Sequence, residues 1–282
     1  MSVFKELKLK DYVTLTGTIF ATIAIFLALL GAFDKNDFFI LMACFSWTGC
    51  IATDLFDGWI ARKLNQVNKI GKEIDSLSDA ISFVVVPGII ILSGSLLEEF
   101  PISILPKEGV IIGILVFIFC GITRLAWYNV SDKGEGYTGL VTPSSATIMV
   151  MVFITQYHFN KLDSGWHTYY QVMTPVSNFF GNTLSITIYM MVLGILNLAP
   201  FLRYGANMQK KRGVWVWILA IFGVFIAIMI ILASIFTGLN VDIAYFIGYI
   251  FPLGFLLSTI AYILYGFSNF IALKKKGEKE PP

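Results

Sequence analysis

Long apolar runs dominate the sequence and decide what kind of fold it can adopt. A helix needs about 20 mostly apolar residues to cross the hydrocarbon core of a membrane. Eight segments meet or approach this length: Val13–Phe33, Phe38–Ile60, Ile81–Leu97, Val110–Tyr128, Pro143–Tyr157, Leu184–Leu202, Val214–Phe236 and Ile243–Leu273. The 282 residues are 57% hydrophobic and only 13% charged, whereas soluble domains carry about 25% charged residues. We therefore predict an all-α integral membrane protein, a polytopic helical bundle of about eight transmembrane helices.

Two of the predicted spans contain residues that affect their shape. The third segment is short, and a helix that extends back through Lys72–Ala80 would lengthen it and bring charged residues to the membrane face. The last segment contains Pro252, which has no N–H to give to a helix and predicts a tilt or a kink.

Lysine and arginine are unevenly distributed between the predicted loops. With a cytoplasmic N-terminus, the outer loops keep only Lys35, Lys107 and Lys161, and every other basic residue falls on the cytoplasmic side. Cytoplasmic loops of membrane proteins carry such an excess. We therefore expect cytoplasmic N- and C-termini, with six spans in residues 1–203 and two additional C-terminal helices and a basic tail in residues 204–282.

Composition argues against several other classes of protein. The formal net charge is +2 and no basic run is interleaved with aromatic residues, so nucleic acid is not an expected partner. The three cysteines lie in apolar runs without a CxxC pair, and neither histidine has a cysteine nearby. We therefore expect neither a zinc site nor a disulfide framework.

One stretch breaks the apolar pattern: TDLFDGWIARKLNQVNKIGKEIDSLSDA, residues 53–80, carries four aspartates. Asp54 and Asp57 are three residues apart, and Asp75 and Asp79 are four apart, so each pair shares one face of a helix. The first pair ends the second span and the other pair begins the third. Because the connection between them is short, these helices are antiparallel neighbours. We therefore expect all four carboxylates to converge at the cytoplasmic face.

Neighbouring carboxylates repel one another unless cations lie between them. Oxygen-rich sites suit Mg²⁺, Mn²⁺ or Ca²⁺, and two metal ions about 3.5–4 Å apart form a common clamp for phosphoryl transfer. Gly58 and Ala61 leave space for a ligand beside the acids, and Arg62 adds a positive charge suited to phosphate. The alternative is a set of surface aspartates paired with Arg62, Lys63 and Lys72. Carboxylates within a membrane-spanning segment are usually functional, so we favour a functional site over this alternative.

These residues resemble the signature of the CDP-alcohol phosphatidyltransferase family. The stretch Asp54-x-x-Asp57-Gly58-x-x-Ala61-Arg62 is followed by eight residues, Gly71, three residues, Asp75, three residues and Asp79, which keeps every spacing of that signature. The resemblance implies a membrane-embedded helical enzyme, usually a homodimer. It also implies that the enzyme cleaves a CDP-linked lipid or alcohol at the cytoplasmic face and releases CMP.

The resemblance implies a role for each residue of the signature. Asp54, Asp57 and Asp75 would hold two divalent metal ions, Mg²⁺ or Mn²⁺, with Asp79 also near them. Asp79 would act as the general base for the acceptor hydroxyl. The residues expected to contact the nucleotide are Thr14, Asp54, Gly58, Ala61, Arg62 and Gly71.

Four further stretches are similar to the phosphatidylserine synthase branch of the family: Asp11–Gly17, Gly71–Pro87, Cys120–Asn129 and Gly136–Ala146. Within them, Gly17, Trp127 and Val141 stand where the branch commonly has Asn, Arg and Pro. The resemblance implies that CDP-diacylglycerol, or its ether analogue CDP-archaeol, donates a phosphatidyl-type group to the hydroxyl of L-serine in the cell membrane.

Three basic residues are candidates to bind the substrate phosphate or the serine carboxylate. Arg124 and Arg203 each end a predicted span on the cytoplasmic side, where Arg124 could instead extend toward lipid headgroups. Lys72 could reach a phosphate, or it could pair with Asp75 or Asp79.

Other functions are open at this level. The same chemistry could serve glycerol 3-phosphate, inositol phosphate or choline as the acceptor. A cation transporter also uses intramembrane acids, but we would expect them near the midplane in broken helices, whereas here they cluster at one face. A catalytically inactive scaffold gains little support from a complete signature.

Overall fold

The computed structural model describes residues 6–64, 68–97, 109–130, 137–161, 182–204, 260–272 and 274. In chain order its elements are α1 (Leu9–Phe33), α2 (Asp37–Lys63), α3 (Lys69–Asp79), the π-helix η2 (Ala80–Val85), α4 (Val86–Ser95), α5 (Val110–Val130), β1 (Tyr137–Thr138), α6 (Thr142–Lys161), α8 (Thr183–Asn197) and β2 (Arg203–Tyr204). A further helix covers Ile260–Ala272. The strands are two residues each and form one antiparallel pair, so these ranges are almost entirely helical.

The described helices include four that are long and apolar enough to cross a membrane: Leu9–Phe33, Asp37–Lys63, Lys69–Ser95 and Val110–Val130. They coincide with the first four predicted spans. The third runs without a break through α3, η2 and α4, and it includes the N-terminal extension expected from the sequence. Shorter apolar helices cover Thr142–Thr155 and Thr183–Asn197. The predicted span Val214–Phe236 lies outside the described residues, as does most of Ile243–Leu273.

The helix α8 ends at Asn197, whereas the apolar run predicts a helix as far as Leu202. Pro200 explains the difference, because it has no N–H for the carbonyl of Leu196 four residues earlier. The backbone N–H of Leu140 donates to that carbonyl instead, at 2.8 Å. The early end of α8 therefore anchors the segment that leads into α6.

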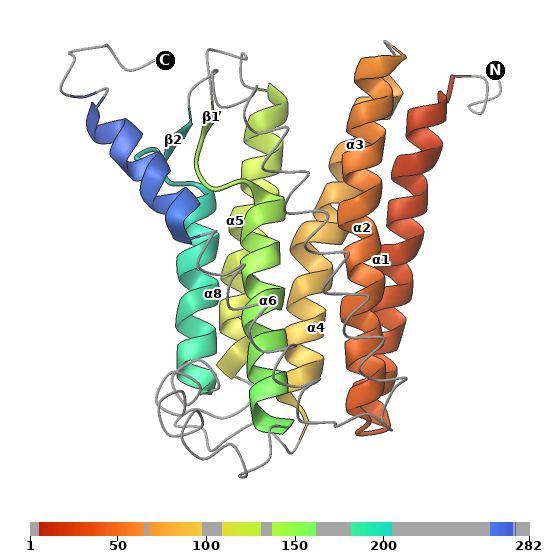
Figure 1. Ribbon diagram of the computed structural model, residues 1–282, viewed down its shortest axis with the longest axis vertical. Helices are drawn as coiled ribbons and strands as arrows, with labels where there is room; N and C mark the ends of the chain where they lie inside the picture. Colours follow the sequence, from red (N-terminus) through yellow and green to blue (C-terminus); the bar gives the residue numbers. More distant parts are fainter. Residues whose placement is uncertain are drawn as a thin grey trace.

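The long helices lie side by side (Figure 1), with α1 packed chiefly against α2 and α5 against α8. α4 lies between these two groups and contacts α1, α2, α5 and α6. The closeness of α1 and α2 follows from a row of small buried residues on α1, namely Gly17, Ala21, Ala24, Ala28 and Gly31. Small residues let two helix backbones approach within a membrane, where the lipid offers no hydrophobic drive for packing.

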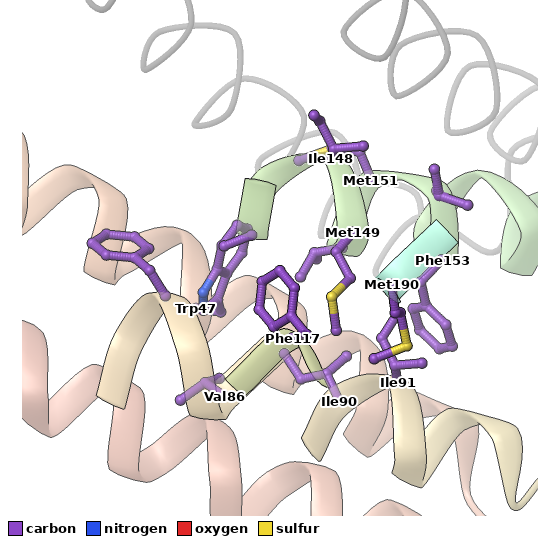
Figure 2. Packing of buried hydrophobic residues seen from close by; sticks show 14 of the residues in the cluster. Trp47, Val86, Ile90, Ile91, Phe117, Ile148, Met149, Met151, Phe153 and Met190 are labelled. Carbon is purple, nitrogen blue, oxygen red and sulfur yellow. The ribbon is translucent and has the colours of Figure 1, made fainter. Parts of the chain in front are cut away.

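Large apolar side chains fill the space between the two groups of helices. Figure 2 shows Trp47 from α2 near Phe117 from α5 and Met149 from α6, all of them fully buried. Ile90 of α4 and Met190 of α8 belong to the same cluster. This core fixes the positions of α2, which continues to Asp54 and Asp57, and of α4, which follows Asp79 through η2.

Candidate active site

Three carboxylates of the predicted acidic cluster come together between α2 and α3. Oxygen atoms of Asp54, Asp57 and Asp75 lie within 4.8 Å of one another. Asp57 is only 6% exposed, whereas Asp54 and Asp75 are half-buried. The two helices are antiparallel, so the last turns of α2 lie beside α3 and the two acidic faces meet, as the spacing predicts.

Asp79 ends α3, one turn after Asp75. It is not one of the three carboxylates within 4.8 Å of one another. It nevertheless interacts electrostatically with Asp54, Asp57 and Asp75, and with the guanidinium of Arg124. Asp79 also lines both of the cavities described below. It therefore connects the carboxylate cluster to the space in front of α5.

Hydroxyl groups of α1 hold the cluster from a third side. Thr14 Oγ1 donates to Asp57 Oδ2 at 2.5 Å and also lies 3.1 Å from the carbonyl oxygen of Lys10. Thr18 Oγ1 donates to Ser78 Oγ at 2.9 Å. Thr14, predicted to contact the nucleotide, thus orients one of the clustered acids. The partner 43 residues away could not be identified from the local sequence.

A second polar network joins the start of α1 to the start of α3. Lys10 Nζ lies 2.7 Å from Asp11 Oδ1, and Asn68 Nδ2 donates to Asp11 Oδ2 at 2.9 Å. A Cβ atom on Gly71 would collide with Asp11 Oδ1 and Asn68 Oδ1. The Lys10 ammonium also attracts the carboxylates of Asp57 and Asp75. Lys10, Asp11 and Asn68 were not predicted as site residues, because only the packing of α1 on α3 brings them to the cluster.

A cavity of about 500 Å³ opens between α3 and α5, at the upper end of both helices in Figure 1. Its walls are formed by Asn68, Lys69, Lys72, Asp75, Ser76, Asp79, Leu125, Tyr128 and Asn129. Lys72 Nζ donates to the carbonyl oxygen of Asn129 at 2.9 Å and makes no ion pair with Asp75 or Asp79. Asn129 Nδ2 donates to Ser76 Oγ at 2.7 Å, so two bonds tie the end of α5 to α3.

A second, much smaller space of about 10 Å³ lies inside the acidic cluster. It is lined by Thr14, Cys50, Thr53, Asp54, Asp57, Ser78, Asp79, Ser82 and Phe83. This volume corresponds to about one water molecule or ion. The surrounding carboxylate and hydroxyl oxygens are the ligands that Mg²⁺ and Mn²⁺ prefer. The residues present therefore fit a hard divalent cation.

The predicted basic residues lie in different environments. Arg124 is 8% exposed, and its Nη1 donates to Thr142 Oγ1 at 3.4 Å. The guanidinium is therefore inside the bundle and does not extend to lipid headgroups. Arg203 pairs through its backbone with Thr138, and its side chain is outside the described part of the structure.

The remaining signature residues lie near the end of α2. The nearest atom to a Cβ built on Gly58 is Arg62 Nη1, at 3.4 Å, so this glycine faces open space apart from the arginine. Ala61 is half-buried and Arg62 is exposed. The space beside Gly58 is thus available to a ligand, whereas the space beside Gly71 is filled by protein.

The fold and the site define a helical membrane protein with a carboxylate cluster near one end of its long helices. Residues 8–181 match the CDP-alcohol phosphatidyltransferase family, and the chain belongs to this family. The match includes the carboxylate cluster and both walls of the larger cavity.

Several proteins that are similar in sequence to this chain carry names that specify a reaction. The archaetidylserine synthase of Methanothermobacter thermautotrophicus is 34% identical over 119 residues, which cover 41% of this chain and 48% of the relative. The CDP-diacylglycerol–serine O-phosphatidyltransferase of Helicobacter pylori is 26% identical over 265 residues, or 92% of each chain. The protein of the same name from Methanocaldococcus jannaschii is 30% identical over 149 residues, 53% of this chain and 62% of the relative.

Proposed function

We propose that this protein transfers a phosphatidyl-type group from CDP-diacylglycerol or CDP-archaeol to the hydroxyl of L-serine and releases CMP. The observation that carries the proposal is the meeting of Asp54, Asp57 and Asp75 within 4.8 Å in a chain of this family. The serine acceptor is supported by the names of three relatives, one of which is similar along 92% of both chains.

We propose that two divalent cations, Mg²⁺ or Mn²⁺, bind to the four aspartates of the signature. Asp54, Asp57 and Asp75 would hold them, with Asp79 completing the site toward the larger cavity. When bound, such cations neutralise the charge of a pyrophosphate and of its leaving group. Thr14 holds the Asp57 carboxylate in one orientation, which prepares that ligand before a cation arrives.

Asp79 is proposed as the general base. The serine hydroxyl oxygen attacks the β-phosphorus of the CDP-lipid and forms a new P–O bond, while the bond from this phosphorus to the bridging oxygen breaks and CMP departs. Asp79 takes the hydroxyl proton, a role that requires hydrogen-bond reach to the acceptor. Asp79 lines both the cluster and the larger cavity, so an acceptor in that cavity meets the base beside the acids.

The remaining signature residues and the three basic candidates are proposed to make the other substrate contacts. The nucleotide is assigned to Thr14, Asp54, Gly58, Ala61, Arg62 and Gly71, with the contact from Gly71 limited to its backbone, because the Asp11 and Asn68 side chains fill the space where a Cβ atom would lie. Arg124 is a candidate for the serine carboxylate or the lipid phosphate, because its guanidinium is buried and interacts with Asp79. Lys72 is another, because it lines the larger cavity. Arg203 stays a candidate on its sequence position alone.

We further propose a homodimer in the cell membrane, with eight spans, cytoplasmic termini and the site open to the cytoplasm. Residues 1–203 would then form the catalytic core and residues 204–282 two additional helices with a basic tail. The distribution of basic residues supports this orientation.

A CMP-release assay on the purified protein tests the function. Mg²⁺ or Mn²⁺ and CDP-diacylglycerol or CDP-archaeol are supplied with serine, glycerol 3-phosphate, inositol phosphate or choline in turn. We expect release with serine, loss of release with EDTA, and loss in Asp79→Asn with CDP-lipid binding retained. Release with another acceptor and none with serine would overturn the serine assignment. Full turnover by Asp79→Asn would exclude its role as the base.

A further inference from the structure

A π-helix follows the last aspartate of the cluster directly. Over Ala80–Val85 the backbone bonds span five residues, and the series ends with the N–H of Val86 donating to the carbonyl of Ile81. The next bond of this kind would join residue 87 to Ser82. Residue 87 is a proline, which has no N–H, so the Ser82 carbonyl receives no bond from it.

The indole of Trp47 takes the place of that missing donor. Trp47 Nε1 donates to the Ser82 carbonyl at 2.8 Å. Trp47 is 0% exposed and Ser82 is 2% exposed, so water does not compete for this bond. Figure 2 shows the Trp47 ring within the buried cluster, near Val86 and Phe117. Packing therefore holds the indole in one place, and a carbonyl of η2 is fixed to α2.

The same two segments also supply acids of the cluster. Trp47 lies seven residues before Asp54, two turns along the same face of α2, and Ser82 lies three residues after Asp79. Ser82 lines the small cavity together with Asp54, Asp57 and Asp79. The bond from Trp47 thus acts within one turn of the proposed base.

A π-turn contains one more residue than an α-turn, and one residue of an α-helix corresponds to about 100° of rotation. Val86, Ile90 and Ile91 of α4 are held in the apolar core beyond the π-turn. If η2 became α-helical, Asp79 would rotate relative to these residues by about that angle. The π-turn therefore sets the direction of Asp79 while α4 stays packed.

We propose that Trp47 is a positioning residue: its indole N–H holds the Ser82 carbonyl, preserves the π-turn and so directs Asp79 toward Asp54 and Asp57. The proposal rests on the function proposed for Asp79. Trp47 itself touches no substrate, since it is completely buried in the apolar core.

The test is Trp47→Phe, which keeps an aromatic ring and removes the donor. We expect kcat to fall about 10- to 100-fold, as for a misplaced catalytic group, with the KM for the CDP-lipid changed less than about twofold. Mn²⁺ affinity, measured by electron paramagnetic resonance without substrate, should fall about 10-fold or more. Trp59→Phe on the same helix is the matched control, since Trp59 is 41% exposed. Trp59→Phe should change neither kcat nor Mn²⁺ affinity.

Pro87→Ala provides the rescue, because alanine restores a backbone N–H that can donate to Ser82. Adding Pro87→Ala to Trp47→Phe should recover at least about threefold in kcat and in Mn²⁺ affinity. Unchanged kcat and Mn²⁺ affinity in Trp47→Phe, or losses that Pro87→Ala does not recover, would overturn the proposal. If Trp47→Phe alone does not fold, the proposal requires that Trp47→Phe combined with Pro87→Ala does fold. Failure of this double variant to fold would also overturn the proposal. If the natural protein releases no CMP with any acceptor, the proposed function fails, and Mn²⁺ affinity still decides the role of Trp47.

Discussion

Gly71 and Gly58 belong to the same signature, but the structure gives them different surroundings. A methyl group on Gly71 would collide with the Asp11 and Asn68 side chains. On Gly58 it would meet only the guanidinium of Arg62, with Nη1 at 3.4 Å and Nη2 at 4.0 Å. Gly71 is therefore required by the packing of α1 on α3, whereas Gly58 leaves space that no other described part of the protein fills.

These two glycines predict opposite outcomes for the same substitution. Gly71→Ala should destabilise the protein by about 1–3 kcal/mol, because the network at the start of α3 must move. Gly58→Ala should leave the thermal unfolding temperature unchanged and raise the KM for the CDP-lipid. Thermal unfolding in detergent and steady-state kinetics measure both effects. Equal destabilisation by the two substitutions would contradict this distinction.

Thr14→Val tests the hydrogen bond to Asp57 with little change in side-chain shape. Loss of a hydrogen bond to a charged partner costs about 1.5–3 kcal/mol, so kcat/KM should fall about 10- to 100-fold. Thr16→Val is the control, since Thr16 is exposed and donates only to the carbonyl of Tyr12 within its own helix. Kinetics at several Mg²⁺ concentrations provide the measurement. Similar activity of the two variants would show that Thr14 does not support the site.

Sequence spacing was sufficient to predict that the acidic pairs meet, because helical periodicity and a short connection are local properties. It could not identify Thr14, Asn68 or Trp47 as partners of the site elements. These residues bond to groups 43, 57 and 35 positions away, respectively. Such contacts depend on how the helices pack together, which the sequence of a single helix does not reveal.

At the scale of the helices, close packing of α1 on α2 depends on the small residues along one face of α1. Ala24→Leu should destabilise the protein by about 1–3 kcal/mol, because Ala24 is 0% exposed and the added atoms have no space. Ile23→Leu, next to it, should have no effect, since Ile23 is 43% exposed. Thermal unfolding in detergent compares the two. A matching loss in both variants would contradict the assigned helix interface.

The apolar runs predicted the existence and approximate limits of the first four long helices. They did not predict the π-helix, and they gave no sign of the bond to its Ser82 carbonyl, because the donor is Trp47, 35 residues earlier on α2. The early end of α8 did have a local signal in Pro200, which the length of the apolar run outweighed. The sequence is thus informative about helices and less so about the breaks within and between them.

For the whole molecule, the orientation in the membrane can be tested with cysteine labelling. Lys35, before α2, and Lys63, its last residue, are both exposed. The helix between them is 27 residues long, or roughly 40 Å. Lys63→Cys should react with an impermeant maleimide from the cytoplasmic side only, and Lys35→Cys from the outer side only. The native cysteines, Cys44, Cys50 and Cys120, are buried and should give little background. The reverse pattern would overturn the proposed orientation.

The two walls of the larger cavity have separate origins in the chain. Its acids come from α3, and they join those of α2 in one helical hairpin, while Leu125, Tyr128 and Asn129 come from α5. Substitution of Leu125 can therefore reshape the larger cavity and leave in place the bonds between Asn129 and the hairpin that carries the acids. A gene duplicate could acquire a preference for another alcohol through α5 alone and inherit the reaction centre intact.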